Sequence, residues 1–100
     1  HMVNVASVEV WMECGLTYQR YGAWAGAAQV FARIMVDFPR YGMANTVYFQ
    51  AAVSLLYLKQ IDKAINYIRA LIPKPPEPYN EVHLTFIIGR WHQMAGRNTQ

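Results

Sequence analysis

Few residues of this 100-residue chain have the types and spacing that chemistry requires. His83 and His92 are nine residues apart, whereas two metal ligands on one helix face need a separation of about three or four, and no carboxylate or thiol completes a set with them. Glu9 and Glu13 form an i,i+4 carboxylate pair, but no buried partner is implied, so a solvated helix face or a groove charge is favoured over acid–base catalysis. The sequence therefore predicts neither a metal site nor a catalytic carboxylate pair.

The remaining chemical signatures are absent from the sequence. It contains no nucleophile–base arrangement, no glycine-rich phosphate loop and no cofactor motif. Cys14 is the single cysteine, and without an evident cationic neighbour we expect a small buried side chain in a helix–helix contact, not a reactive thiol. Because no disulfide can form within the chain, a reducing compartment is the default and we expect a cytoplasmic protein. The expectation is a protein that is not an enzyme and needs no cofactor.

Composition favours one all-helical domain outside a membrane. The hydrophobic content of 54% is ample for a core, and the apolar residues recur at helical spacing. The longest apolar run, Ala51–Leu58, is interrupted by Ser54 and is far shorter than the ~20 residues that cross a bilayer. The formal charge of +3 comes from scattered residues, so nucleic acid is an unlikely partner.

The stretch from Trp11 to Pro39 has the pattern of two amphipathic helices folded back on one another, with a break at Gly22. Gly15 and Ala27 are small enough for the two backbones to approach closely. Three bulky side chains are expected to fill the space around them: Trp11, Tyr18 and Phe31. A unit this small cannot bury its apolar face alone, so the pattern predicts that it repeats.

An offset of 37 residues carries Gly15 to Ala52 and then to Gly89. It also carries the break at Gly22 to Lys59 and then to Gly96. Five further pairs keep their size class under the same shift: Trp11 and Tyr48, Tyr18 and Leu55, Ala27 and Ala64, Phe31 and Ile68, Ile34 and Leu71. The chain is therefore predicted to be a tandem helical repeat.

These residues resemble the tetratricopeptide repeat, whose signature is W-x-x-L-G-x-x-Y, then A-x-x-x-F, then Pro at the end of the second helix. The first repeat matches closely, with Cys14 where Leu is usual, and the second is looser. The third repeat has only its first helix. There Ile88 and Gly89 match the Leu-Gly of the signature, whereas Thr85 and His92 stand where the signature has Trp and Tyr. The usual period is about 34 residues, so the extra ones are expected in the loops after Pro39 and around 73–78.

The resemblance implies a right-handed α-solenoid of five helices in antiparallel pairs. We expect repeats at 8–41 and 42–78 and a partial one at 79–96, preceded by a lead-in with a tag remnant (1–7) and followed by a truncated end of a longer protein (97–100). The helices are expected at about 8–21, 23–38, 46–59, 62–72 and 81–95, with caps at Asn4 or Ser7, at Asn45 and at Asn80. Residues 73–78, Pro-Lys-Pro-Pro-Glu-Pro, are expected to form a stiff connector, with a docking ligand as the alternative.

By the same resemblance, the first helix of each repeat lines a concave groove for a partner peptide or subunit. The groove is expected to present Met12, Glu13, Leu16, Arg20, Phe49, Gln50, Val53, Tyr57, His83, Phe86 and Arg90. An exposed end face, without the helix that would cover it, is expected at Ile88, Trp91 and His92. The basic clamp that binds the tails of heat-shock chaperones is absent, because the matching positions are Met12, Leu16, Gln50, His83 and Ile87.

Two alternatives to a peptide-binding scaffold stay open. The apolar faces could pair with another copy of the chain, which would make it a homo-oligomerisation module. A pentatricopeptide-like reader of RNA has a similar helix pair, but Phe49, Val53 and Leu56 argue against it, since base reading needs polar side chains and a basic groove.

Overall fold

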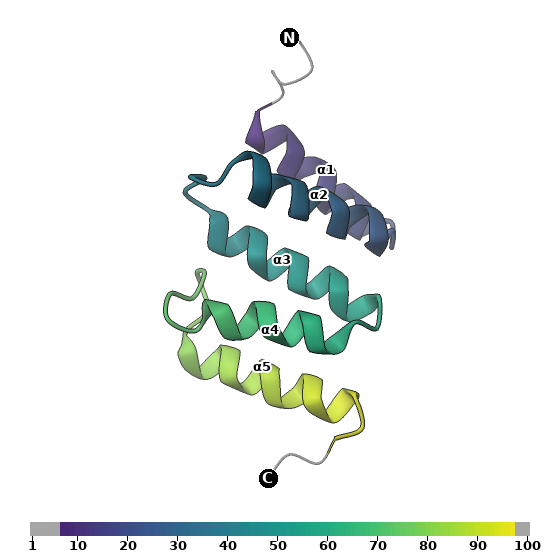
Figure 1. Ribbon diagram of the computed structural model, residues 1–100, viewed down its shortest axis with the longest axis vertical. Helices are drawn as coiled ribbons and strands as arrows, with labels where there is room; N and C mark the ends of the chain where they lie inside the picture. The colour runs from purple at the N-terminus through teal and green to yellow at the C-terminus, as the bar shows by residue number, and fades with distance from the viewer. Residues whose placement is uncertain (1–6, 98–100) are drawn as a thin grey trace.

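The computed structural model describes residues 7–97, and over this range the chain is all-α, with five helices and no strand (Figure 1). The helices are α1 (Val8–Arg20), α2 (Trp24–Asp37), α3 (Ala44–Tyr57), α4 (Ile61–Leu71) and α5 (Glu81–Met94). The predicted all-α class and the number of helices are confirmed for this part of the chain. The possible cap at Asn4 lies outside the described residues.

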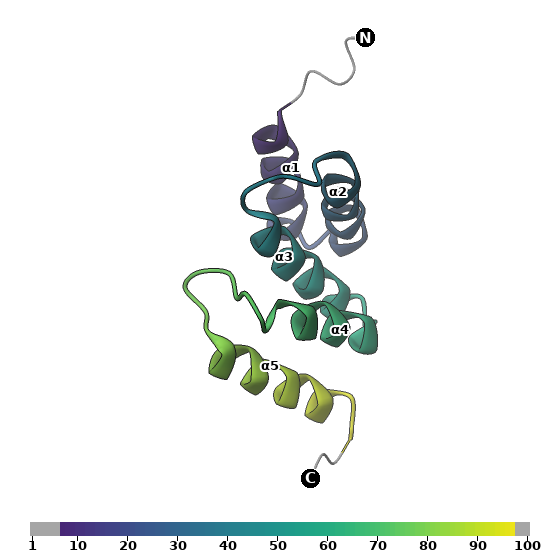
Figure 2. The ribbon, with the colours of Figure 1, turned by 60° about the vertical axis from the view of Figure 1, so that its left-hand side comes forward.

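The helices form a row in which each one packs on the next along the chain. The row is elongated, with extents of 53 × 27 × 19 Å, and its long axis runs across the helices (Figure 1). Turning the molecule places α2 and α4 toward one side of the row and α1, α3 and α5 toward the other (Figure 2). Residues far apart in sequence can therefore share a face when their helices alternate along the row.

The same backbone conformation recurs at the turn after α1, α3 and α5. Gly22, Lys59 and Gly96 have φ angles of 75°, 69° and 79°, in the left-handed region. Glycine adopts this region without strain, and a helix commonly ends on such a residue. The three positions are those related by the 37-residue offset, so the predicted helix ends at Gly22 and Gly96 are confirmed.

Two of the predicted N-caps, Ser7 and Asn80, are observed, and a third, Asn45, is not. Ser7 caps α1, with its Oγ accepting from the Val10 amide at 3.4 Å, and the Asn80 side chain accepts from the His83 amide at 2.9 Å at the start of α5. The prediction of Asn45 as a cap was wrong, because α3 begins at Ala44, with Met43 at the N-cap position, and Asn45 lies inside the helix. The Asn45 amide instead donates to the Lys74 carbonyl at 2.6 Å and so anchors the connector.

The connector between α4 and α5 is held against the body of the protein. Besides the Asn45 contact to Lys74, the side chain of Pro76 is buried. A buried proline is not accessible to a partner domain, so these contacts favour the spacer over the docking ligand.

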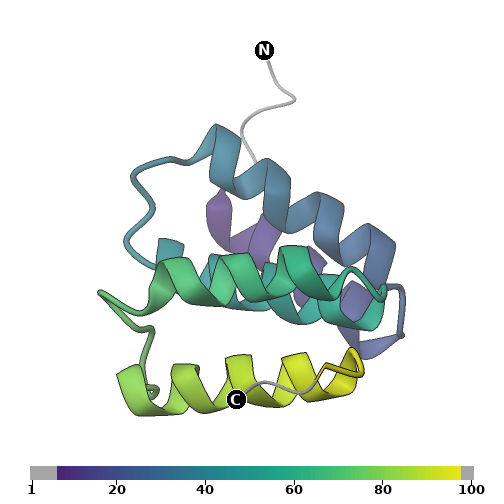
Figure 3. The ribbon, with the colours of Figure 1, turned by 60° about the horizontal axis from the view of Figure 1, so that its bottom comes forward.

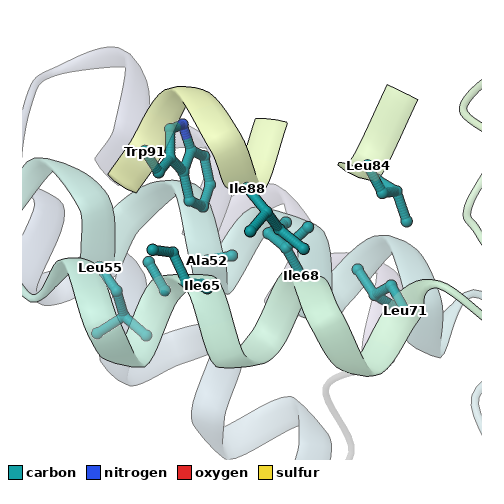
Figure 4. Packing of buried hydrophobic residues seen from close by; sticks show 9 residues of the cluster. Ala52, Leu55, Ile65, Ile68, Leu71, Leu84, Ile88 and Trp91 are labelled. Atoms are coloured by element: carbon teal, nitrogen blue, oxygen red, sulfur yellow. The ribbon is translucent and has the colours of Figure 1, made fainter. Parts of the chain in front are cut away.

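The core consists of two clusters along the row. One joins α1, α2 and α3, and the other joins α3, α4 and α5. In the second cluster, α5 runs alongside α4 (Figure 3) and turns its apolar side chains toward it (Figure 4). The buried members of this second cluster are Ala52, Leu55, Ala64, Ile65, Ile68, Leu71, Leu84, Ile88 and Trp91.

Gly15 of α1 packs closely against the Phe31 ring of α2, one of the side chains predicted to fill the space around it. A Cβ added to Gly15 would lie 2.6 Å from Cε1 of Phe31, closer than real Cβ contacts allow. Phe31 rather than Ala27 therefore occupies the space over the glycine, and both are fully buried. On the same helix pair, the ring of Tyr18 lies against Gly26.

Gly15→Ala is expected to destabilise the protein by about 1–3 kcal/mol, because the Phe31 ring must move to admit the methyl group. Gly89→Ala is the matched control, since a Cβ there meets nothing within 4 Å. Removing a mid-helix glycine at an open position is expected to stabilise the protein by about 0.5–1 kcal/mol. Urea denaturation of both variants measures the difference, and equal shifts would show that Gly15 is not a packing position.

Cys14 is exposed, so the prediction of a buried thiol was wrong. Met12 and Gly15 are the buried residues of α1; Met12 packs in the cluster with α2 and α3, and Gly15 lies against Phe31 of α2. Helical periodicity placed Cys14 next to this apolar face, but the side of α1 on which it lies has no neighbouring helix among residues 7–97.

Candidate partner-binding site

The predicted groove residues lie on α1, α3 and α5, which occupy one side of the row (Figure 2). A partly buried polar contact joins α1 to α3. The Gln19 side-chain amide donates to the Gln50 carbonyl at 3.2 Å and to Ser54 Oγ at 3.1 Å, and Ser54 in turn donates to the Gln50 carbonyl at 3.0 Å. These bonds satisfy the buried Ser54 and fix the position of α3 relative to α1.

Aromatic rings are held in defined orientations near both ends of α3. At its C-terminal end, Tyr57 stacks on Trp24, with 4.1 Å between ring centroids and 9° between planes, yet 56% of Tyr57 stays exposed. Near its N-terminal end, half-buried Phe49 stacks on Tyr79 of the connector at 4.7 Å. Stacking restricts the rings, which lowers the entropy that a bound partner would have to remove.

Two of the three charged residues of α1, Glu13 and Arg20, make an exposed pair. Arg20 Nη2 lies 3.1 Å from Glu13 Oε2 and also donates to Thr17 Oγ1 at 2.9 Å. Both side chains are mostly in solvent, where such a pair contributes little to stability. They therefore remain free to exchange partners at low cost.

On α5, Phe86 and Arg90 line an open cavity of about 160 Å³ together with Gly89 and Gln93. Phe86 is 65% exposed. His83 is used locally, since its Nδ1 accepts from the Asn80 amide at 3.1 Å to complete the cap of α5. Leu16, Gln50 and Val53 are only half-buried and so retain surface on α1 and α3.

Three predicted site residues lie in the core. Met12 is buried with the α2 cluster, so its assignment to an accessible groove was wrong. Ile88 and Trp91 are each 8% exposed because they face α4, which corrects the prediction that they form an exposed end face. The third member of that face, His92, is half-buried, with its Nδ1 2.8 Å from Arg97 Nη1. Helical periodicity identified which side of α5 is apolar, but it did not show that this side packs on α4.

A larger cavity, which the sequence analysis did not foresee, opens between α2 and α4. It measures about 330 Å³, with buried Ala51 and Leu55 from α3 among its lining residues. Lys63 and Tyr67 line it from α4. The available signal was a set of small residues at helical spacing on α2: Ala25, Ala28 and Ala32.

Residues 7–97 contain no group of three or more His, Cys, Asp and Glu side chains that could hold a metal ion. Within the same range, none of the helices has the length and apolar character needed to span a membrane. The arrangement supports non-covalent binding through aromatic and aliphatic side chains edged by polar groups.

Comparison of the chain with family models, with curated proteins and with solved structures finds no match. The likeness to the tetratricopeptide repeat therefore rests on the quoted residues alone. The fold that the structure itself establishes, for residues 7–97, is an all-α row of five helices.

Proposed function

We propose that this chain is a protein–protein interaction scaffold, with its helices arranged as a right-handed, tetratricopeptide-like solenoid. A partner segment binds along the side formed by α1, α3 and α5. The role is non-catalytic, and it needs no cofactor. Tyr57 carries the proposal: it is 56% exposed, yet its ring is held by stacking on Trp24.

A rigid, accessible aromatic ring is the typical anchor of a protein interface, because it buries a large area and loses little conformational freedom. Phe86 offers a second exposed ring on α5, one of the three helices on this side of the row (Figure 2), and the Glu13–Arg20 pair on α1 supplies polar contacts. An extended or helical peptide with apolar anchors suits this combination.

The experiment is selection of binders from a peptide library displayed on phage, followed by titration of synthetic copies against variants. Tyr57→Glu is expected to weaken their binding by about tenfold or more, which corresponds to about 1.4 kcal/mol or more. Val36→Glu is the matched control, since Val36 is 74% exposed but lies on α2, toward the opposite side. It is expected to leave affinity within about twofold.

Thermal unfolding of both variants verifies that the substituted proteins remain folded. Peptides that are insensitive to Tyr57→Glu but lose binding with Lys63→Glu would move the site to the cavity between α2 and α4. A library that yields no binder to the folded wild-type protein would contradict the proposal.

A further inference from the structure

We propose that the cavity between α2 and α4 binds a medium-chain fatty carboxylate, with the carboxylate beside Lys63 and the alkyl tail running toward Met35. The cavity measures about 330 Å³ and lies where α2 and α4 share one side of the row (Figure 2). This volume is within the usual range of small-molecule sites. The inference does not depend on the proposed peptide-binding function, which is tested through Tyr57.

The cavity lies inside the row, with α1 packed on α2 and α5 packed on α4 beyond it. The 37-residue offset relates its lining residues Ala28 and Ala51 to Ile65 and Ile88. Both isoleucines are buried in the core cluster where α4 meets α5, so large side chains fill that junction. At the equivalent junction of α2 with α3, both positions hold alanine. The cavity therefore arises from small side chains at repeat positions that are bulky elsewhere in the chain.

Most of the lining is apolar, and it is long enough for an alkyl tail. Ala51 and Leu55 of α3 are its buried residues. Along α2 the lining extends from Ala25 to Met35, a rise of about 15 Å, which is comparable with an extended medium-length alkyl chain. Each methylene that moves from water into such surroundings raises affinity by up to about fourfold.

Polar side chains of the lining gather where α4 begins. Gln60 is at the N-cap position and Lys63 is in the first turn, and Gln29 lines the cavity from α2. Lys63 is the one charged residue of this lining, and no ion pair joins it to another of residues 7–97. The adjacent Asp62 pairs instead with Arg97 at 2.6 Å. An ammonium group and two amide donors beside an apolar lining are complementary to a carboxylate that carries an apolar tail.

The other end of the cavity is mainly apolar. Both α2 and α4 begin at the right of the row and end at the left (Figure 1), so Met35, near the end of α2, lies away from Lys63. Met35 also lines a second cavity, of about 150 Å³, together with Phe38 and Val47. Methionine side chains are flexible and fill irregular space, so a tail that outgrows the first cavity can enter the second.

Calorimetric titration of the protein with decanoate is the first test. Decanoate is expected to bind at one molecule per chain and about tenfold more tightly than decan-1-ol, which lacks the charge. Affinity is expected to rise from hexanoate to octanoate to decanoate. Decyltrimethylammonium, a cation with the same tail, is expected not to bind. Absence of saturable decanoate binding, or equal affinities for decanoate and either of the other two ten-carbon ligands, would refute the proposal.

Lys63→Met tests the carboxylate contact, because it removes the charge and keeps an unbranched side chain. It is expected to weaken decanoate binding about tenfold and to leave decan-1-ol within about twofold. Lys74→Met is the matched control, since Lys74 is exposed in the connector and does not line the cavity. It is expected to change neither affinity. Equal effects of the two substitutions on decanoate would show that Lys63 does not hold the carboxylate.

Ala32→Leu tests the position of the tail, because Ala32 lines the cavity from an exposed position and leucine would occupy it without entering the core. Binding of decanoate is expected to weaken about tenfold or more. Ala70→Leu, at an exposed alanine of α4 outside the cavity, is the matched control and is expected to have no effect. Thermal unfolding verifies that both variants remain folded. Decanoate binding that survives Ala32→Leu, or that is lost with Tyr57→Glu, would place the ligand elsewhere and overturn the proposal.

Discussion

Phe31→Ala is expected to lower the free energy of unfolding by about 3–5 kcal/mol. Phe31 is fully buried in the cluster that joins α1, α2 and α3, and its ring lies directly over Gly15. Truncation removes the ring and leaves a cavity that a glycine cannot fill. Since domains of about 100 residues are stable by about 5–15 kcal/mol, the loss is a large part of the total.

Urea denaturation followed by circular dichroism measures this change. Phe86→Ala is the matched control, because the same side chain is removed from a position that is mostly exposed. Its expected effect is within about 0.5 kcal/mol. Equal losses from the two variants would contradict the packing of Phe31. Combining Phe31→Ala with Gly15→Ala is expected to cost less than the sum of the single changes, because the cavity admits the added methyl group.

Trp91→Ala is expected to release α5 from the rest of the row. Trp91 belongs, with Leu84 and Ile88 of the same helix, to the cluster that α5 shares with α3 and α4 (Figure 4), and α4 is the main helix that α5 contacts. The loss of a buried Trp costs about 3–5 kcal/mol. A terminal helix that packs mainly on one neighbour can open without unfolding the others, so the effect is expected to be local.

Hydrogen exchange detected by mass spectrometry resolves the two ends of the row. Amides of α5 are expected to exchange faster by roughly two to three orders of magnitude in Trp91→Ala, at about 1.4 kcal/mol for each tenfold change, while those of α2 keep their protection. Met94→Ala, at an exposed position of the same helix, is the control and is expected to change neither. Uniform acceleration over all five helices would show that the row unfolds as one unit.

The sequence determined the elements and their order for residues 7–97. Helical periodicity predicts the five helices, and Gly22 and Gly96 mark helix ends because a positive φ is a local property of the chain. Lys59 also has a positive φ, although lysine as a residue type does not predict it. Only the 37-residue offset, which relates Lys59 to Gly22 and Gly96, indicates this left-handed conformation. The cap at Asn80 is equally local, since it depends on a residue three positions away.

Only the tertiary structure decided which of these repeated positions are covered. Cys14, Ala51 and Ile88 occupy one repeat position, yet the first is exposed and the other two are buried. The difference arises because a side chain is buried only where another helix packs on it. Helical periodicity shows which residues share a face of a helix, but not whether another helix contacts that face. For the same reason the large cavity between α2 and α4 and the smaller cavity that Phe86 and Gly89 line on α5 could be found only once the helices were placed side by side.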